Sequence, residues 1–253
     1  MIPQALIFDV DGTMADTEEL HRQAFNGALA RHGYNWNWSR DDYRELLRIT
    51  GGKERIAHFI RTLALDTRRQ DECLTEVVAL HRTKTILYAH GASSGSIGLR
   101  SGIARLIGDA RKRGVRLSLV TTTSPANVEA LLTRTLAPEA LSWFEVVVAG
   151  DMVTNKKPAP DAYLLALSRL GLSAGECVAF EDSGNGLRAA SAAGIRTVVT
   201  PCQWTMGEDF SDAWLTLPEL GDPQRPLPSG AAPGLSQPWL TLDDLEQVTG
   251  DAA

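Results

Sequence analysis

The stretch ALIFDVDGT, residues 5–13, decides the fold of this chain. It is a short apolar run, rich in β-forming residues, that passes directly into Asp11, Gly12 and Thr13. Such a run followed by a polar turn predicts a buried strand with acidic side chains at its carboxyl end. The next segment of this character is LSLVT, residues 117–121. A crossover between parallel strands needs only about 10–12 residues, so the long segment between the two strands must form a unit of its own.

The intervening segment has the periodicity of helices. Asp16 or Thr17 can cap the first helix. The predicted helices cover residues 17–31, 40–48, 53–63 and 70–88. The stretch HGASSGSIG, residues 90–98, consists mainly of small residues and is typical of a hinge or linker. We therefore interpret residues 16–95 as an inserted all-helical domain.

After Ser101 the chain alternates between helical and strand patterns. The predicted strands are residues 117–121, 144–149, 177–180 and 197–199. The predicted helices are residues 103–112, 126–133, 158–170 and 185–193. Such alternation implies a parallel sheet with helices on both faces. The sequence thus predicts an α/β fold, in which a Rossmann-like parallel-sheet core, residues 1–15 and 96–220, carries the helical insert.

The C-terminal extension, residues 221–253, has a different character. Five of the twelve prolines lie between Pro223 and Pro238, which favours an extended surface segment. A short acidic helix is predicted at 242–248. The sequence leaves open whether this extension binds a partner or packs on the core.

Composition limits the function of the protein. The 253 residues carry a net charge of −6, and an acidic surface disfavours nucleic acid as the main partner. The sequence contains neither a run of about 18 apolar residues, which a membrane span needs, nor a recognisable signal peptide. Three scattered cysteines exclude a disulfide framework or a zinc site. We expect a cytoplasmic monomer with neither nucleic acid nor membrane as a partner.

Polar side chains follow four of the predicted strands. Ligands of an open parallel sheet bind beyond the carboxyl ends of its strands, so these side chains are candidates for one site. They are Asp9 and Asp11 after the first strand, Thr121, Thr122, Thr123 and Ser124 after the second, Lys156 and Lys157 after the third, and Glu181 and Asp182 after the fourth.

These residue types suit chemistry at a phosphoryl group. Asp9 is placed to act as a nucleophile and Asp11 as an acid and base. Glu181 and Asp182, together with Asp9 and the Asp11 carbonyl, offer the oxygen ligands that Mg²⁺ prefers. Such a cation offsets the repulsion between an anionic nucleophile and a phosphoryl group.

Further groups would complete a phosphate site. Lys157, singled out from Lys156 by the Lys-Pro step, would add positive charge. Thr121 would offer a hydroxyl to a phosphoryl oxygen, although Thr122, Thr123 and Ser124 compete with it for that role.

The same residues resemble a known family. DVDGT at 9–13, Thr121, KPAPDAY at 157–163 and EDSGNG at 181–186 match the four motifs of the haloacid dehalogenase-like hydrolases. The helical insert resembles the cap of the subfamily that includes phosphoglycolate phosphatase and β-phosphoglucomutase.

The resemblance implies a role for each matched residue. Asp9 would form an aspartyl-phosphate, Asp11 would act as acid and base, and Thr121 and Lys157 would bind the phosphoryl group. Asp182 would bind the metal, with Glu181 beside it. Dehalogenases lack the second aspartate, so Asp11 disfavours carbon–halogen chemistry.

A narrower resemblance lies in the cap. AxTEELHRxAFN from Ala15, DDYRELLRITGGKERI from Asp41, HRTKT from His81 and VTTTS from Val120 are similar to the CbbY proteins. These phosphatases act on xylulose 1,5-bisphosphate, a misfire product that inhibits Rubisco and so the Calvin cycle. The departures are mild: Met14 replaces a more usual leucine, and the proline-rich extension has no recognised counterpart.

A bisphosphate requires cations from the cap for its second phosphate. Lys53 and Arg55, beside Gly52 at a predicted helix N-terminus, suit that role. Arg44 and Lys84 are further candidates. Glu18 and His21 share one face of the first cap helix and are candidates to contact sugar hydroxyls.

Three other functions are considered. A phosphomutase of the β-phosphoglucomutase type would share the aspartyl-phosphate, and a phosphatase of another small metabolite such as phosphoglycolate would share the whole mechanism. A non-catalytic phosphate sensor would tolerate loss of Asp9 or Asp11, and both are present. Trp36 and Trp38 are expected in the cap core, and the cysteines are expected to be inert and buried.

Overall fold

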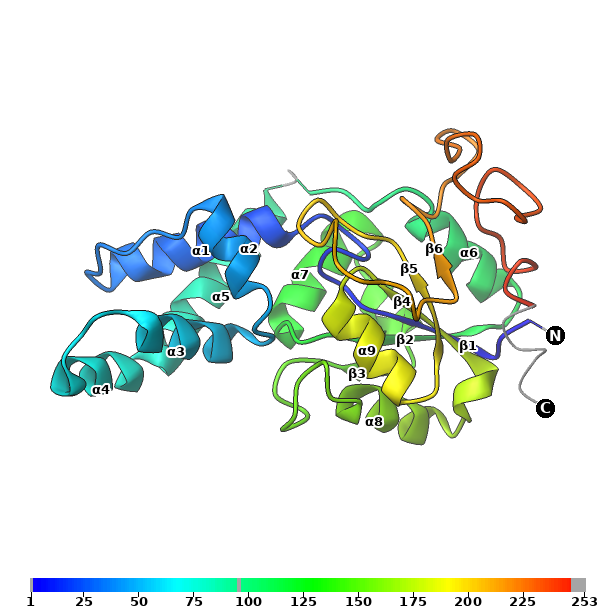
Figure 1. The fold of residues 1–253 in the computed structure, drawn as a ribbon. Coiled ribbons are helices and arrows are strands. Elements are labelled where there is room, and N and C mark those ends of the chain that lie inside the picture. The colour runs from blue at the N-terminus through cyan, green and yellow to red at the C-terminus, as the bar shows by residue number, and fades with distance from the viewer. Residues whose placement is uncertain (1, 95–96, 247–253) are drawn as a thin grey trace.

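The structure is a computed structural model that describes residues 2–94 and 97–246. A six-stranded parallel sheet forms its core, with the strand order β3-β2-β1-β4-β5-β6 (Figure 1). The strands are β1 (Ala5–Phe8), β2 (Arg116–Val120), β3 (Val146–Val148), β4 (Cys177–Glu181), β5 (Arg196–Val199) and β6 (Leu215–Thr216). The predicted α/β class with a parallel sheet is confirmed. The two-residue edge strand β6 was not predicted.

Strand register brings the predicted site residues to one edge. Phe8 of β1 lies opposite Leu119 of β2 and Phe180 of β4. Asp9 and Glu181, the residues that follow Phe8 and Phe180, are therefore neighbours at the carboxyl edge. The Phe8 and Phe180 rings stack with their centroids 4.6 Å apart, which fixes this register from within the core.

Helices cover both faces of the sheet. Alternate side chains of a strand point to opposite faces. Leu6 and Phe8 accordingly pack with α6 (Ile103–Lys112) and α7 (Pro125–Thr135). Ala5 and Ile7 pack on the other face, in a cluster that includes residues of α8 (Asp161–Leu170) and α9 (Gly184–Ala192). The first strand is thus buried on both sides, as its continuous apolar run requires.

The helical insert, called the cap below, lies at one end of the core (Figure 1). Its helices are α1 (Glu18–Arg31), α2 (Arg40–Leu46), α3 (Gly52–Thr62), α4 (Thr67–Thr75) and α5 (Val77–Ser93). Trp38 is buried against Phe25 and Tyr43 in its aromatic core, and Trp36 packs on this cluster. Both tryptophans therefore belong to the cap core, as predicted.

Two predicted boundaries in the cap are wrong. The helix predicted at 70–88 is two helices separated at Glu76. The linker predicted from residue 90 begins later, because α5 continues to Ser93; residues 95 and 96 lie outside the described part. The small residues have a packing reason, since a Cβ on Gly91 would sit 2.4 Å from Leu20 of α1.

The C-terminal extension runs over the surface, as predicted, with all five prolines of 223–238 exposed, and is anchored to the core by leucines. Leu227, Leu240, Leu242 and Leu245 are buried in the same cluster as Leu6 and Phe8. Arg105 of α6 donates to the Gly221 and Leu240 carbonyls at 2.9 and 2.7 Å. Residues 242–245 form a turn, and the rest of the helix predicted there, from residue 247, lies outside the described residues.

Two smaller observations complete the description. Cys73, Cys177 and Cys202 are buried thiols, as expected. Of the helices in residues 2–94 and 97–246, none has the length and apolar character that crossing a membrane requires.

Candidate active site

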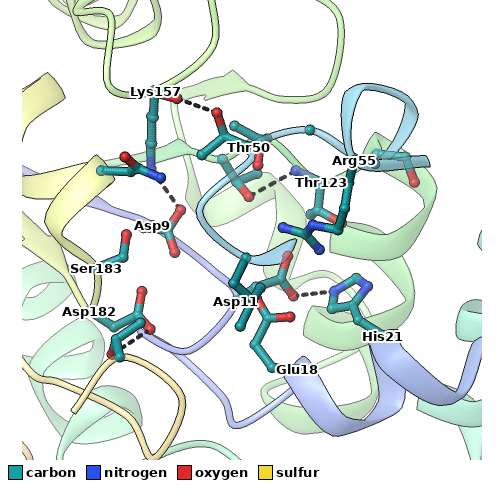
Figure 2. A pocket seen from close by; sticks show the side chains of 18 of the residues that line it. Asp9, Asp11, Glu18, His21, Thr50, Arg55, Thr123, Lys157, Asp182 and Ser183 are labelled. Carbon is teal, nitrogen blue, oxygen red and sulfur yellow. Dashed lines mark hydrogen bonds and ion pairs between the residues drawn. The ribbon is translucent and has the colours of Figure 1, made fainter. Parts of the chain in front are cut away.

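Lys157 is the centre of the buried polar network at the sheet edge (Figure 2). Its ammonium donates to Asp9 Oδ1 at 2.7 Å, to Glu181 Oε1 at 2.6 Å and to the Val120 carbonyl at 2.8 Å. Burial opposes its charge, but the two carboxylates outweigh burial and hold the pKa of Lys157 above its ordinary value. Lys157 therefore brings a fixed positive charge to Asp9, beside β2.

Three buried carboxylates form a cluster suited to a metal. Asp9, Glu181 and Asp182 each offer an oxygen, and these oxygens lie within 4.8 Å of one another. Glu181 Oε2 is buried and finds no hydrogen-bond donor among the described residues. Burial, with the charges of Asp9 and Glu181, raises the pKa of Asp182 well above its ordinary value. An all-oxygen cluster of three carboxylates, whose negative charge the single ammonium of Lys157 offsets only in part, fits a hard divalent cation.

Gly12 lets the chain turn tightly around this cluster. Its φ of +82° lies in the left-handed region, and a Cβ there would sit 2.1 Å from Asp182 Oδ2. Only glycine satisfies both conditions. The backbone of the β1 turn thus approaches Asp182 closely.

Asp11 has different partners from Asp9. Its Oδ1 accepts from Thr17 Oγ1 at 2.6 Å and lies 2.8 Å from His21 Nε2. Lys84 Nζ lies 2.5 Å from His21 Nδ1. An ammonium can only donate, so His21 accepts at Nδ1 and presents its Nε2 proton to Asp11. The predicted role of the Asp11 carbonyl in metal binding stays a prediction.

The environment of Asp11 favours its ionised form. Burial opposes ionisation, but the hydrogen bonds that His21 and Thr17 donate, together with the positive charge of Lys84, lower the pKa of Asp11. Burial raises the pKa of Asp9 to about 8, against the influence of Lys157. With no cation bound, Asp9 therefore ionises less readily than Asp11.

The hydroxyl side chains that follow β2 also line the cavity in which Asp9 and Asp11 lie. Thr121 Oγ1 accepts from the Thr123 amide at 3.2 Å, and Asn127 donates to Thr123 Oγ1 at 3.1 Å. Ser124 directly precedes α7 as its N-cap residue, and its buried Oγ has no partner in the described part of the chain. Thr123 is therefore already engaged, whereas Ser124 retains a free hydroxyl.

The cavity lies between cap and core and contains most of the predicted ligands. Those that line it are Asp9, Asp11, Glu18, His21, Gly52, Arg55, Lys84, Thr121, Thr122, Lys157 and Asp182. Glu181 lies beneath it, wholly buried. Lining residues that were not predicted as ligands include Phe25, Leu47, Thr50, His81, Ser183, Asn185, Thr205 and Glu208.

Two predicted cap ligands lie outside this cavity. Lys53 reaches back to the core and pairs with Asp151 at 2.5 Å. Arg44 lies on the exposed side of α2, where it pairs with Asp41 at 3.4 Å. Of the four candidate cations, Arg55 and Lys84 are therefore the two that face the cavity.

A tyrosine holds two of the cavity residues together. The Tyr43 hydroxyl donates to Glu18 Oε2 at 2.7 Å and accepts from Arg55 Nη1 at 2.9 Å. Sequence reasoning missed Tyr43, because its role depends on packing between α1, α2 and α3. Thr205 and Glu208 were missed although a signal existed, since they follow β5, whose end also lies at the site edge.

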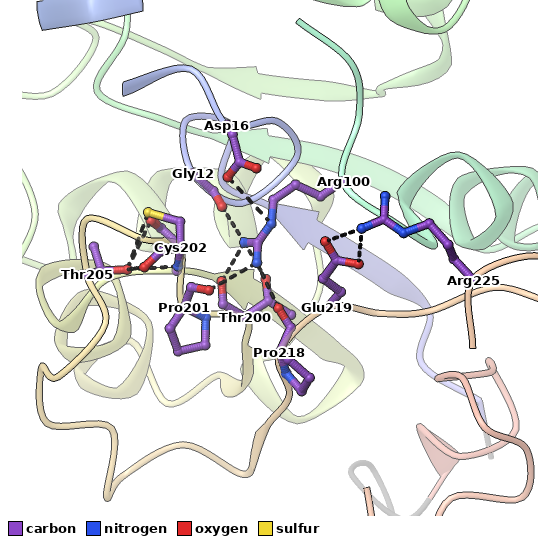
Figure 3. Close-up of polar contacts among 11 residues, drawn as sticks. Gly12, Asp16, Arg100, Thr200, Pro201, Cys202, Thr205, Pro218, Glu219 and Arg225 are labelled. Carbon is purple, nitrogen blue, oxygen red and sulfur yellow. Dashed lines mark hydrogen bonds and ion pairs between the residues drawn. The ribbon is translucent and has the colours of Figure 1, made fainter. Parts of the chain in front are cut away.

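Arg100 anchors the loops around the site (Figure 3). This buried guanidinium donates to main-chain carbonyls of residues far apart in the sequence: Gly12 at 2.5 Å, Thr200 at 2.6 Å, Pro201 at 3.0 Å and Pro218 at 2.9 Å. The turn after β1, the loop after β5 and the segment after β6 are thereby joined to one side chain. The sequence analysis did not identify Arg100 either.

The chain is similar to known hydrolases over most of its length. The profile of the haloacid dehalogenase-like hydrolases matches residues 3–194, a range that contains all four strand-end motifs. The chain therefore belongs to the haloacid dehalogenase-like hydrolases.

Individual members of the family indicate which kind of hydrolase the chain is. The protein CbbY of Cupriavidus necator is 48% identical over 239 residues, which are 94% of this chain and 94% of that protein. A crystal structure of CbbY from Rhodobacter sphaeroides with phosphate superposes with a TM-score of 0.79 at 47% identity, covering 87% of this chain and 95% of that one. A mutant of that enzyme in complex with xylulose 1,5-bisphosphate matches with the same TM-score and coverage at 46% identity. The family and these relatives together identify the chain as a phosphatase, that is, a phosphoric monoester hydrolase.

Proposed function

We propose that the protein is a Mg²⁺-dependent sugar-phosphate phosphatase that hydrolyses xylulose 1,5-bisphosphate through an aspartyl-phosphate on Asp9. The observation that carries the proposal is the separation of Asp9 and Asp11 within one cavity. Asp9 lies with Lys157 and the acidic cluster, whereas Asp11 lies with His21 and Lys84 of the cap. The R. sphaeroides relative that binds xylulose 1,5-bisphosphate supports the choice of substrate.

The first step is transfer of the phosphoryl group to Asp9. A carboxylate oxygen of Asp9 bonds to phosphorus as the bond from phosphorus to the sugar oxygen breaks. Asp11 enters this step protonated, a form that the negative charge of the bound substrate favours over the ionised form of the free enzyme, and gives that proton to the departing sugar oxygen. Lys157 and Thr121 bind the phosphoryl oxygens. When bound at the acidic cluster, Mg²⁺ supplies positive charge that offsets repulsion between Asp9 and the phosphoryl group.

The second step restores the enzyme. Asp11 takes a proton from water, and the resulting hydroxide oxygen attacks the phosphorus of the aspartyl-phosphate. The bond from phosphorus to Asp9 breaks, and inorganic phosphate leaves. The His21 hydrogen bond keeps the Asp11 carboxylate oriented in both steps.

The second phosphate of the substrate would bind cap cations. Arg55 and Lys84 face the cavity, and Gly52 brings the first amides of α3 to it. A helix N-terminus attracts anions because its first amides have no partner within the helix. Lys53, paired with Asp151, would have to exchange that carboxylate for the phosphate.

A phosphate-release screen tests the proposal. The purified protein with Mg²⁺ is offered sugar mono- and bisphosphates, including xylulose and ribulose 1,5-bisphosphate, and phosphoglycolate. We expect the highest kcat/KM with xylulose 1,5-bisphosphate, in accord with a role in removing an inhibitor of Rubisco. If phosphate is released preferentially from phosphoglycolate, that compound and not xylulose 1,5-bisphosphate is the substrate. An isomerised sugar phosphate formed without phosphate release would identify a phosphomutase.

The Asp9→Asn variant tests the mechanism. Loss of the nucleophile should abolish turnover while thermal unfolding still shows a folded protein. Electrophoresis after acid quenching should reveal a transient phosphoprotein with the wild type and none with the variant. Turnover near the wild-type rate in the variant would exclude the aspartyl-phosphate mechanism.

A further inference from the structure

The loop that follows β5, residues 200–206, leaves the core and enters the cap. Its Trp204 is only 4% exposed and belongs, with Cys202, to the cluster that contains Phe25, Trp38 and Tyr43 of the cap. Figure 1 shows this loop in yellow-orange, extending from the sheet toward α2. A tryptophan from the core therefore completes the aromatic core of the cap.

Trp204 contacts α2 on several sides. Its ring meets the Tyr43 ring edge-on, with centroids 5.4 Å apart and planes at 87°. The guanidinium carbons of Arg40 and Arg44 lie 4.8 and 5.8 Å from the Trp204 ring centroid. Arg40 also donates to Gln203 Oε1 at 3.2 Å. Aromatic pairs and cation–π contacts of this geometry are attractive, so they favour the position in which cap and core meet.

The ring next to Trp204 is the one that organises the cavity. Tyr43 binds Glu18 through its hydroxyl hydrogen and Arg55 through its hydroxyl oxygen. Glu18 and Arg55 both line the cavity, whereas Trp204 does not touch it. Displacement of Tyr43 would move both ligands together.

The other end of the loop is fixed to the core (Figure 3). Arg100 donates to the Thr200 and Pro201 carbonyls at 2.6 and 3.0 Å. Thr205 Oγ1 accepts from the Cys202 amide at 3.0 Å and lies 3.4 Å from Asp182 Oδ2. The loop therefore spans from a carboxylate of the acidic cluster to the tyrosine that positions the cap ligands.

We propose that Trp204 is a positioning residue that fastens the closed cap to the core and thereby places Glu18 and Arg55 on the substrate. The inference rests on the proposed function, since those ligands matter only for a substrate that reaches the cap. A small phosphate ester that contacts only Asp9, Lys157 and the acidic cluster would not need Trp204.

Steady-state kinetics of Trp204→Ala and Trp204→Phe test this role. With xylulose 1,5-bisphosphate, Trp204→Ala should raise KM roughly tenfold, the scale expected for loss of an aromatic pair and a cation–π contact. With p-nitrophenyl phosphate, kcat/KM should stay within about twofold of the wild type. Trp204→Phe keeps an aromatic ring against Tyr43 and should recover most of the wild-type KM.

Trp143→Ala is a matched control. Trp143 also lies under an arginine, with the Arg111 guanidinium carbon 3.8 Å from its ring centroid, but it packs on the core cluster of the sheet and not on the cap. This variant should leave both KM values unchanged. Equal losses for both substrates in Trp204→Ala, or an unchanged KM for the bisphosphate, would overturn the proposal.

Small-angle X-ray scattering separates this inference from the proposed function. If the wild type hydrolyses p-nitrophenyl phosphate but no sugar phosphate, the proposed substrate is wrong while the role of Trp204 is still measured. With Mg²⁺ and inorganic phosphate, Trp204→Ala should have a larger radius of gyration than the wild type and Trp204→Phe. Identical radii for all three proteins would show that Trp204 does not hold the cap.

Discussion

Asp9 and Asp11 are two residues apart, yet their carboxylates face different parts of the molecule. Asp9 is paired with a lysine of the core, and Asp11 with a histidine of the cap. The cap therefore contributes directly to the orientation of the predicted acid and base. Thr17, where the chain passes from the core into the cap, also donates to Asp11, so the orientation of Asp11 does not depend on closure of the cap alone.

Replacement of Gly12 by alanine should damage the site more than the fold. The left-handed backbone costs about 1–2 kcal/mol with a Cβ, and this Cβ would sit 2.1 Å from Asp182 Oδ2. Displacement of a group at the reacting centre by about 1 Å can cost roughly a hundredfold in rate. We expect a loss of kcat of that order, measured by phosphate release.

Gly33→Ala is the matched control for this prediction. Gly33 has a similar φ of +79°, and a Cβ there meets no described atom within 4 Å. It should destabilise the protein to a similar degree, as measured by chemical denaturation, with kcat preserved. Equal kcat losses in the two variants would show that backbone strain, and not the contact with Asp182, is responsible.

Lys84 should give the reaction a pH dependence of its own. Burial lowers the pKa of Lys84 to about 8, with Arg55 adding to the shift and Asp11 and Glu18 opposing it. The Lys84 side chain is a positively charged ammonium below that pH, and it loses this charge as the pH rises through it. Because kcat/KM reports the free enzyme, its value for the bisphosphate should fall above about pH 8 relative to that for p-nitrophenyl phosphate.

Lys84→Arg separates this effect from other titrations. A guanidinium keeps its charge throughout this range, so the ratio of the two kcat/KM values should become independent of pH between about 7 and 9. The comparison concerns the shape of the profile, and a lower overall activity would not affect it. A wild-type profile in the variant would assign the titration to another group.

At the scale of elements, the sequence predicts most of the sheet and its edge. Runs such as residues 5–8 and 177–180 are continuous and apolar because helices cover both faces, so their pattern is unambiguous. The order of polar groups at the strand ends then follows from topology alone. Residues 70–93 were less well predicted, because the break at Glu76 and the close approach of Gly91 to Leu20 depend on tertiary packing.

The site was predictable where one element carries the chemistry and less so where two elements meet. Asp9 and Asp182 follow strands directly, Lys157 lies in the segment between β3 and α8, and the structure brings all three to one cavity. Tyr43 and Arg100 act through contacts with segments distant in sequence, for which periodicity and spacing carry no signal. Lys53 was a reasonable candidate from its helix position, but Asp151, 98 residues away, pairs with it.

Arg100 provides a prediction about how elements are joined. Its guanidinium bonds carbonyls from the turn after β1, from the loop after β5 and from the segment after β6. A lysine keeps the charge but cannot bridge them, so Arg100→Lys should lower the free energy of unfolding by about 3 kcal/mol. Urea denaturation measures this loss.

Arg113→Lys serves as the reference for Arg100→Lys. Arg113 pairs with Asp243 at the surface, where both side chains are substantially exposed. An exposed ion pair contributes about 0–1 kcal/mol, and lysine retains most of it. If the two substitutions cost the same, the carbonyl contacts of Arg100 would contribute little to stability.

At the scale of the whole molecule, cap and core are joined around the cavity by contacts from several loops. Asn185 Nδ2 donates to the Arg48 carbonyl at 3.1 Å, and the Thr50 hydroxyl donates to the Lys157 carbonyl. With Lys53 paired to Asp151 on another side, these contacts surround the Asp9 carboxylate. We therefore expect these contacts to break when substrate enters and when product leaves, so that cap movement accompanies each turnover.

The C-terminal extension lies at the end of the molecule opposite the cap (Figure 1). Its leucines complete the cluster behind the sheet, and Leu240 is wholly buried there. Leu240→Ala should lower the free energy of unfolding by about 2–5 kcal/mol, the usual range for a leucine removed from a packed core. Leu164→Ala, at a position 49% exposed on α8, should change this free energy by about 0.5 kcal/mol or less.

Because Leu240 lies away from the cavity, kcat for phosphate release should be the same in both variants below their unfolding temperatures. A fully stable Leu240→Ala protein would contradict the packing role and favour the alternative in which the extension serves a partner.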